Sequence, residues 1–173
     1  MFCKTMVATL AAFALITLSA CGGDNAGQGD HSAATEAEAQ PAMPLTTYKS
    51  ATCGCCQLWI EHTEDSGFSV SARDVEDLNA VKDQYGIEPR YQSCHTSVSP
   101  QGFIFEGHVP AKIIRQFLQN PPEGARGLAV PAMPLGSPGM EVGERFTPYD
   151  VFLLHSDGSV SVYAHIDSIE AQH

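Results

Sequence analysis

The chain has 173 residues, with 9 Lys and Arg against 20 Asp and Glu, which gives a net charge of −11 at pH 7. This length fits one folded domain with a flexible flanking segment. The acidic balance argues against nucleic acid as a partner and against electrostatic docking on anionic lipid, because both need clustered Lys and Arg. A negatively charged surface instead attracts cations.

Residues 1–20 have the features of an export signal. Lys4 supplies the positive start, and residues 6–18 form an apolar run shorter than the roughly 20 residues that a bilayer span needs. The run ends in Leu-Ser-Ala-Cys21, which resembles a bacterial lipobox. We therefore expect a lipoprotein signal peptide, lipidation at Cys21 and a periplasm-facing membrane anchor. Gly22 favours the outer membrane by analogy, and an ordinary secretory signal is the alternative.

Residues 21–44 predict a flexible tether, because they are rich in Gly, Ala, Glu and Gln and lack hydrophobic periodicity. We expect one domain over 45–168 and a tail over 169–173. The first half of this domain alternates strands and helices. The predicted elements are a strand at 45–49, a helix at 53–65, a strand at 68–72, a helix capped by Asp74 and stopped at Gly86, and a strand at 102–106.

The second half begins with a helix that has Pro110 at its first position and ends before Asn120-Pro121-Pro122. Residues 124–147 are Pro- and Gly-rich and without periodicity, which predicts a long functional loop. Two strands follow at 149–154 and 159–165, joined by a turn at Asp157-Gly158. The predicted class is therefore α/β, with a thioredoxin-like β-α-β-α core, a long Pro/Gly loop and a C-terminal β-hairpin.

Six cysteines are present, and Cys3 and Cys21 belong to the leader and the lipidation site. The domain keeps four of them: Cys53, Cys55, Cys56 and Cys94. Three stand within four residues at a predicted helix start, where free N–H groups and the helix dipole favour thiolate over thiol. Thiolates this close repel one another unless a cation neutralises them, and soft thiolates select Cu(I), Zn(II) or iron–sulfur clusters. The sequence thus predicts a soft-metal site.

Four further side chains are candidate ligands: His95, His108, Met133 and Met140. His95 is adjacent to Cys94, and its neutral ring could ligate or orient. A thioether suits Cu(I) and not Zn(II), and both methionines lie in the Pro/Gly loop rather than in an apolar stretch. The alternative for each of these residues is an ordinary structural role: a structural histidine, a helix cap or a core methionine.

Two other interpretations of the cysteines remain open. One is a pair of disulfides, Cys53–Cys56 and Cys55–Cys94, as expected of an exported protein. The other is a thiol-disulfide oxidoreductase, in which Cys53 attacks and Cys56 resolves, because a strand followed by Cys-x-x-Cys and a helix is the thioredoxin arrangement. The extra Cys55 is unfavourable for that enzyme, since a third thiol competes for the mixed disulfide.

Several sequence blocks, in order, resemble the periplasmic metal-binding proteins of the CopG copper-resistance type, long described as a domain of unknown function. The resemblance covers residues 45–164, with Ala51 where proline is common and Ala132 where glycine is common. The matching blocks are Tyr48-Lys49-Ser50-Ala51-Thr52-Cys53-Gly54-Cys55-Cys56, Ser93-Cys94-His95-Thr96, Glu106-Gly107-His108-Val109-Pro110, Gly127-Leu128-Ala129-Val130-Pro131, Met133-Pro134, Gly136-Ser137-Pro138-Gly139-Met140-Glu141 and Tyr149-Asp150-Val151.

This resemblance implies a thioredoxin-like fold and a copper cluster held by the Cys-x-Cys-Cys motif and Cys94. It also implies interconversion of Cu(I) and Cu(II), so a role as a copper or thiol oxidoreductase is open. We therefore expect a copper-binding lipoprotein of the cell envelope that serves copper resistance or handling. Copper ions are its expected ligands, nucleic acid is not an expected partner, and the protein that exchanges copper with it is not identified by the sequence.

Overall fold

The computed structural model describes residues 41–173, so the predicted signal peptide, the lipidation of Cys21 and nearly all of the predicted tether lie outside the described residues. Within that range the chain forms three α-helices and seven strands. They are β1 (Met43–Lys49), α1 (Gly54–Asp65), β2 (Phe68–Asp74), α2 (Leu78–Gln84), β3 (His95–Val98), β4 (Ile104–Glu106), α3 (Ala111–Gln119), β5 (Ala125–Ala129), β6 (Tyr149–His155) and β7 (Val160–Ile166). Within residues 41–173, each helix is too short or too polar to span a bilayer.

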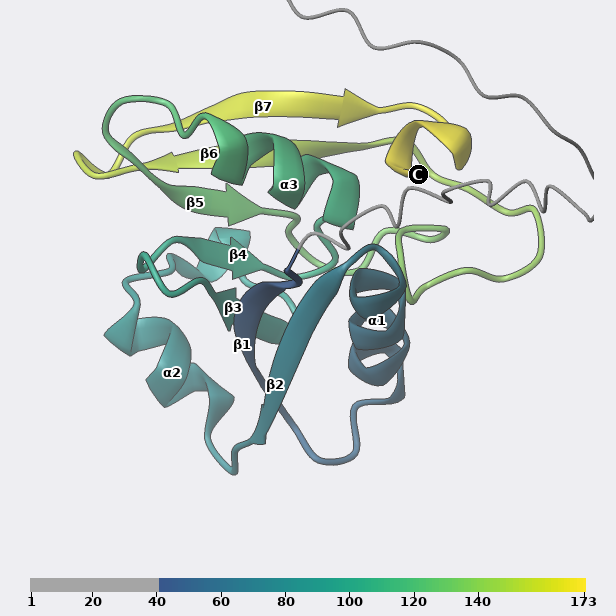
Figure 1. The fold of residues 1–173 in the computed structure, drawn as a ribbon, viewed down its shortest axis with the longest axis horizontal. Coiled ribbons are helices and arrows are strands. Elements are labelled where there is room, and N and C mark those ends of the chain that lie inside the picture. The colour runs from purple at the N-terminus through teal and green to yellow at the C-terminus, as the bar shows by residue number, and fades with distance from the viewer. Residues whose placement is uncertain (1–40) are drawn as a thin grey trace, which may run out of the picture. The chain divides into compact units, whose positions relative to one another are not determined.

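The strands form a single mixed sheet in the order β2-β1-β3-β4-β5-β6-β7 (Figure 1). The pairs β1–β2 and β4–β5 are parallel, and the other neighbouring pairs are antiparallel. The predicted α/β class and the C-terminal hairpin of β6 and β7 are confirmed, and the thioredoxin-like description stays a prediction. This order puts β3 directly beside β1, although 45 residues lie between their ends.

The helices cover the two faces of the sheet unequally. Buried side chains of α1 and α3, among them Trp59 and Phe117, pack with Leu45 and Phe105 of the sheet in one apolar core. The smaller α2 lies over the opposite face, where the ring of Tyr85, just after α2, packs at a tilt against the ring of Tyr48 of β1. Neighbouring positions along β1 and β3 therefore point alternately toward the α1 face and the α2 face.

Helix α1 confirms the predicted one, with the same buried face of Cys56, Trp59, Ile60 and Thr63. The predicted cap at Asp74 is wrong. Asp74 instead ends β2, where parallel pairing sets it beside Lys49 and their side chains form an ion pair at 2.8 Å. The cap of α2 is Asp77, which accepts a hydrogen bond from the backbone N–H of Ala80 at 3.1 Å.

Two strands were missed by the sequence analysis. Residues 95–98 carry a polar sequence and become β3 only because β1 and β4 lie on either side. The loop predicted over 124–147 is wrong at its start, because Ala125–Ala129 form β5. The rest of the loop is irregular apart from one isolated bridge between Val142 and Arg145. A Cβ at Gly127 of β5 would overlap the carbonyl of Ile104, so this glycine permits β5 to pair with β4.

The ends of α3 and of the chain differ slightly from expectation. Pro110 is the cap before α3 rather than its first residue, a difference of one position. The predicted tail contains a short 3₁₀ turn, Glu170–Gln172. Gln172 is buried there, accepting from the Tyr149 hydroxyl at 2.8 Å and donating to the Gly136 carbonyl at 2.7 Å. This contact holds the C-terminal residues against the long loop.

Candidate metal centre

The four cysteines of the domain come together where β1 and β3 run side by side. Cys53 is the cap of α1, and Cys55 and Cys56 lie in its first turn. Cys94 immediately precedes β3, whose first residue, His95, pairs with the last residue of β1. The turn between β1 and α1 therefore meets the start of β3, which explains how a cysteine 38 or 39 positions away reaches the helix.

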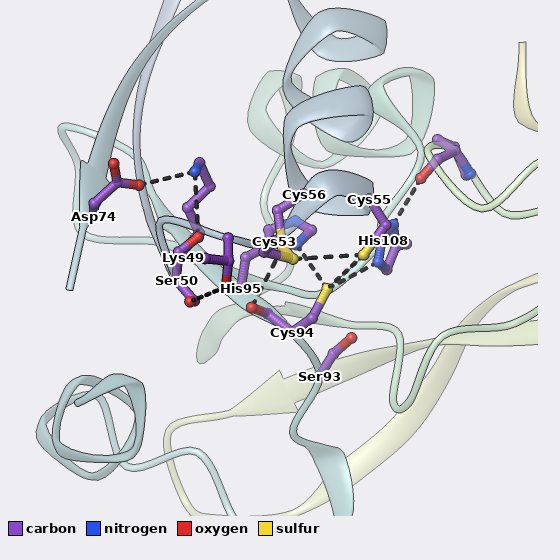
Figure 2. Close-up of a disulfide and its surroundings, with 12 residues drawn as sticks. Lys49, Ser50, Cys53, Cys55, Cys56, Asp74, Ser93, Cys94, His95 and His108 are labelled. Carbon is purple, nitrogen blue, oxygen red and sulfur yellow. Dashed lines mark hydrogen bonds and ion pairs between the residues drawn. A yellow bond between two sulfur atoms is a disulfide. The ribbon is translucent and has the colours of Figure 1, made fainter. Parts of the chain in front are cut away.

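Figure 2 shows the sulfur atoms facing one another. Cys53 and Cys56 form a disulfide, and the Sγ of Cys55 lies 3.5 Å from that of Cys53 and 3.9 Å from that of Cys94. The Sγ of Cys56 lies 3.5 Å from the carbonyl oxygen of Cys94. All four sulfur atoms lie within 4.8 Å of one another, a spacing at which one metal ion or a compact cluster could contact all of them.

Of the two disulfides in the structural interpretation of the cysteines, one is present and one is not. Cys53–Cys56 is formed, whereas Cys55 and Cys94 are free thiols, so the second pairing is absent from the described part of the chain. In this oxidised form only two of the four clustered cysteines, Cys55 and Cys94, can become thiolate ligands. Reduction of the disulfide adds two thiols at the same place, so the number of soft donors depends on the redox state of the cysteines.

His108 faces Cys94 with a defined ring nitrogen. Its Nδ1 donates to the carbonyl of Pro138 at 2.7 Å, which leaves Nε2 directed at the Sγ of Cys94, 3.0 Å away. Burial lowers the pKa of His108 and favours the neutral ring. A neutral imidazole with a proton on Nδ1 carries its lone pair on Nε2, the state that a metal ligand needs.

His95 is fully buried and lies on the α1 face of the sheet. Its Nδ1 is 3.4 Å from the Sγ of Cys94, and its ring packs 4.4 Å from the ring of Trp59. Burial, with a smaller contribution from neighbouring His108, holds the pKa of His95 well below its usual range. Its Nε2 is buried without a hydrogen-bond partner among the described residues, which is rare for a polar atom. Donor atoms of Cys94, His95 and His108 lie within 4.8 Å of one another, so they form a second set that could hold an ion.

The Cys94 thiol is electrostatically distinct. Burial is the main cause that raises its pKa to about 12, and the nearby Cys55 adds to the shift. Without a metal, Cys94 is therefore a thiol that can donate its S–H to Nε2 of His108. A bound cation would displace that proton, because only the thiolate is a strong ligand.

The Pro/Gly loop lies against this site. Besides the contact of Pro138 with His108, Gly139 is packed on α1, where an added Cβ would lie 2.6 Å from the Cys55 carbonyl oxygen and 2.7 Å from the Trp59 nitrogen. Met133 is 49% exposed and Met140 is half-buried. Ligation by either methionine stays a prediction.

Sequence reasoning missed a buried ion pair next to the site. Nζ of Lys82 lies 2.5 Å from Oε1 of Glu106, and both side chains are almost completely buried. Burial raises the pKa of Glu106, while Lys82 opposes that shift. A charged residue ending the otherwise apolar stretch 103–106 was the only signal in the sequence, and it could not identify Lys82 as the partner.

Comparison with known proteins gives a consistent picture. A family model described as a protein of unknown function, DUF411, matches residues 91–140. Two solved structures, described as the copper resistance protein copG in form 1 and form 2, are each 40% identical in sequence with a TM-score of 0.69. Each match covers 73% of this chain and 99% of the solved chain. No curated protein matches the sequence.

Proposed function

Because the chain belongs to the family of the copper resistance protein CopG, we propose that it binds and handles copper. Its cargo is Cu(I), held by the four clustered cysteines as thiolates when all of them are reduced. The single observation that carries the proposal is the meeting of all four sulfur atoms within 4.8 Å at a helix start. Soft sulfur donors in this number and spacing favour Cu(I) over hard cations.

The two histidines complete the proposed site. The neutral His108 offers Nε2 toward Cys94, and Nδ1 of His95 lies 3.4 Å from the same sulfur atom. We place His108 among the ligands and His95 as either a ligand or a group that orients Cys94. The Pro138–Gly139 turn limits access of water from the loop side, and Met133 or Met140 can lend a thioether.

The disulfide supports a redox role for the same site. Two Cu(II) ions would each accept one electron from the Cys53 and Cys56 thiols, which form one disulfide and release two protons as two Cu(I) ions appear. The free thiols of Cys55 and Cys94 would remain to bind the product. Interconversion of Cu(I) and Cu(II) is thus proposed as an activity of the copper site.

A second candidate function is thiol-disulfide exchange with a protein substrate. It is favoured by the Cys53–Cys56 disulfide at the start of α1, the position of a redox dithiol. Reduction of a disulfide substrate by the metal-free dithiol, abolished by Cys53→Ser and unaffected by copper, would favour this function. Loss of reduction activity on copper loading is instead expected if copper is the cargo.

For its place in the cell we propose the envelope, with a lipid anchor at Cys21. The proposal rests on the lipobox-like sequence at residues 18–21. Cells fed with a radioactive fatty acid are expected to label the unsubstituted chain but not Cys21→Ser, which would leave the membrane fraction. Equal labelling of the two chains would contradict the anchor.

The copper proposal is tested by titrating the reduced full chain with Cu(I) and, separately, with Zn(II) under anaerobic conditions. A colorimetric chelator that competes for each metal measures the affinity. We expect tight uptake of Cu(I) that is lost when the four clustered cysteines are replaced by serine. Tight uptake of Zn(II) with none of Cu(I) would contradict the proposal.

A further inference from the structure

The carboxylate of Glu106 accepts a hydrogen bond from each end of the short segment 93–96, which contains Cys94. Its Oε1 accepts from the backbone N–H of Ser93 at 2.6 Å, and its Oε2 accepts from the hydroxyl of Thr96 at 2.6 Å. Cys94 and His95 are the two residues between these anchors. Because Thr96 is also the cross-strand partner of Glu106, the carboxylate connects β4 to the start of β3 and to the residues before it.

Lys82 fixes this carboxylate from the other side. Its Nζ lies 2.5 Å from Oε1 of Glu106 and donates to Oγ1 of Thr96 at 3.1 Å. It is the buried residue of α2, and only 2% of it is exposed. Exchanging a buried ion pair for apolar side chains often leaves stability unchanged or raises it, so stability alone is a weak explanation for this one.

We propose that Glu106, held by Lys82, is a positioning residue for the thiol of Cys94. Ser93 precedes β3, so its N–H is bonded by the Glu106 carboxylate rather than by the strand ladder. With that bond in place, Cys94 is held 3.9 Å from the sulfur of Cys55. The inference deepens the proposed function, and its consequence for copper rests on that function.

Loss of the carboxylate has a defined consequence. A half-buried N–H without an acceptor costs free energy, which the Ser93 segment can recover by turning outward to water. Cys94 would then leave the other sulfur atoms and become more exposed, although the rest of β3 keeps its pairing with β1. The cluster of four sulfur atoms would fall to three.

The test compares two double variants in the full chain. Lys82→Met with Glu106→Leu removes the buried charges and the acceptor together, whereas Lys82→Met with Glu106→Gln returns an amide oxygen that can accept from Ser93. The matched control is Thr47→Val with Ser97→Ala, which deletes a buried polar pair at 2.8 Å between β1 and β3 without touching Glu106. Thermal unfolding and far-UV circular dichroism confirm that each variant is folded.

Two readouts are measured on each folded chain. The first is the alkylation rate of Cys94 relative to that of Cys55 in the metal-free oxidised protein, located by peptide mass spectrometry. The second is the Cu(I) affinity of the reduced protein. The Leu variant is expected to alkylate severalfold faster at Cys94 and to lose about tenfold or more in Cu(I) affinity, as for other residues that orient metal ligands. The Gln variant recovers toward the control in both.

Unchanged alkylation of Cys94 in the folded Leu variant would overturn the proposal. If that variant does not fold, Thr96→Val decides instead, because it removes one anchor and keeps the ion pair, and a smaller increase in the same direction is expected. Absence of an increase there would equally overturn it. A parent chain that takes up no Cu(I) would refute the proposed function alone, since the alkylation readout needs no metal.

Discussion

The Sγ of Cys94 lies 3.0 Å from Nε2 of His108, and the other ring nitrogen of that histidine donates to the Pro138 carbonyl. The long loop therefore selects the tautomer whose lone pair faces the cysteines. This relationship joins three separate parts of the chain, namely the start of β3, the turn before α3 and the Pro/Gly loop, in one arrangement of donors.

Replacing His108 by Ala is expected to weaken Cu(I) binding by about 10- to 100-fold, the range typical of groups that ligate or support a metal site. The matched control is His155→Ala, because His155 lies on β6 and its ring Nε2 contacts the Ser161 hydroxyl rather than the cysteines. Competition with a Cu(I) chelator measures both. Equal affinities of the two variants would remove His108 from the site.

The Pro/Gly loop is expected to act on the site through Gly139. Gly139→Ala places a Cβ against the backbone of Cys55 and Trp59, whereas Gly143→Ala meets nothing within 4 Å, and both residues have positive φ. Each variant should lose about 1–2 kcal/mol from the positive φ, and only Gly139→Ala should lose about 1–3 kcal/mol more from overpacking. Denaturant unfolding measures stability, and only Gly139→Ala is expected to bind Cu(I) more weakly. Equal losses in both variants would contradict close packing of the loop on α1.

Ala132 is the one residue other than glycine with positive φ, at 57°, in the described part of the chain. Ala132→Gly is expected to stabilise the protein by about 0.5–1 kcal/mol, because relief of the left-handed strain exceeds the added entropy of the unfolded chain. Ala51→Gly, in a turn without positive φ, should lose stability through the same entropy. Thermal unfolding distinguishes the two variants, and a loss of stability in both would contradict backbone strain at Ala132.

Local sequence patterns correctly predicted the elements that do not depend on which other strands or helices lie beside them. The buried face of α1 followed from helical periodicity, and Asp157-Gly158 gave the hairpin. Asp74 was misassigned because its role depends on β1. Parallel pairing with β1 extends β2 as far as Asp74 and sets this residue beside Lys49. The strands β3 and β5 are short, and flanking strands rather than their own sequence define them.

The sequence predicted the cysteines of the candidate site, but not the buried residues that hold them in place. Clustering of Cys53, Cys55 and Cys56 is local, so the sequence contains it directly. The redox state of the pair Cys53–Cys56 is set by the environment as well as by spacing, and spacing alone left it open. The Lys82–Glu106 pair could not be predicted, because burial of two charges depends on which strands and helices meet around them.

The raised pKa of Cys94 predicts how pH acts on the metal-free oxidised protein. An ordinary thiol titrates near 9, and burial raises the pKa of Cys94 to about 12, so between these values the folded state holds a proton that the unfolded state has lost. Stability is therefore full below about pH 9 and falls as pH rises toward 12. Urea unfolding from pH 8 to 11 measures the slope. Cys94→Ala should reduce it and Cys55→Ala should keep most of it, and an unchanged slope in Cys94→Ala would contradict the assignment.

The metal content of the full chain, purified anaerobically from copper-fed cells, tests the central claim most directly. Elemental analysis gives the identity of the metal and its number per chain, and a chain with its four clustered cysteines replaced by serine is the control. The account predicts copper in the unsubstituted chain, no stoichiometric zinc, and no copper in the control. Stoichiometric zinc without copper, or equal copper in both chains, would contradict it.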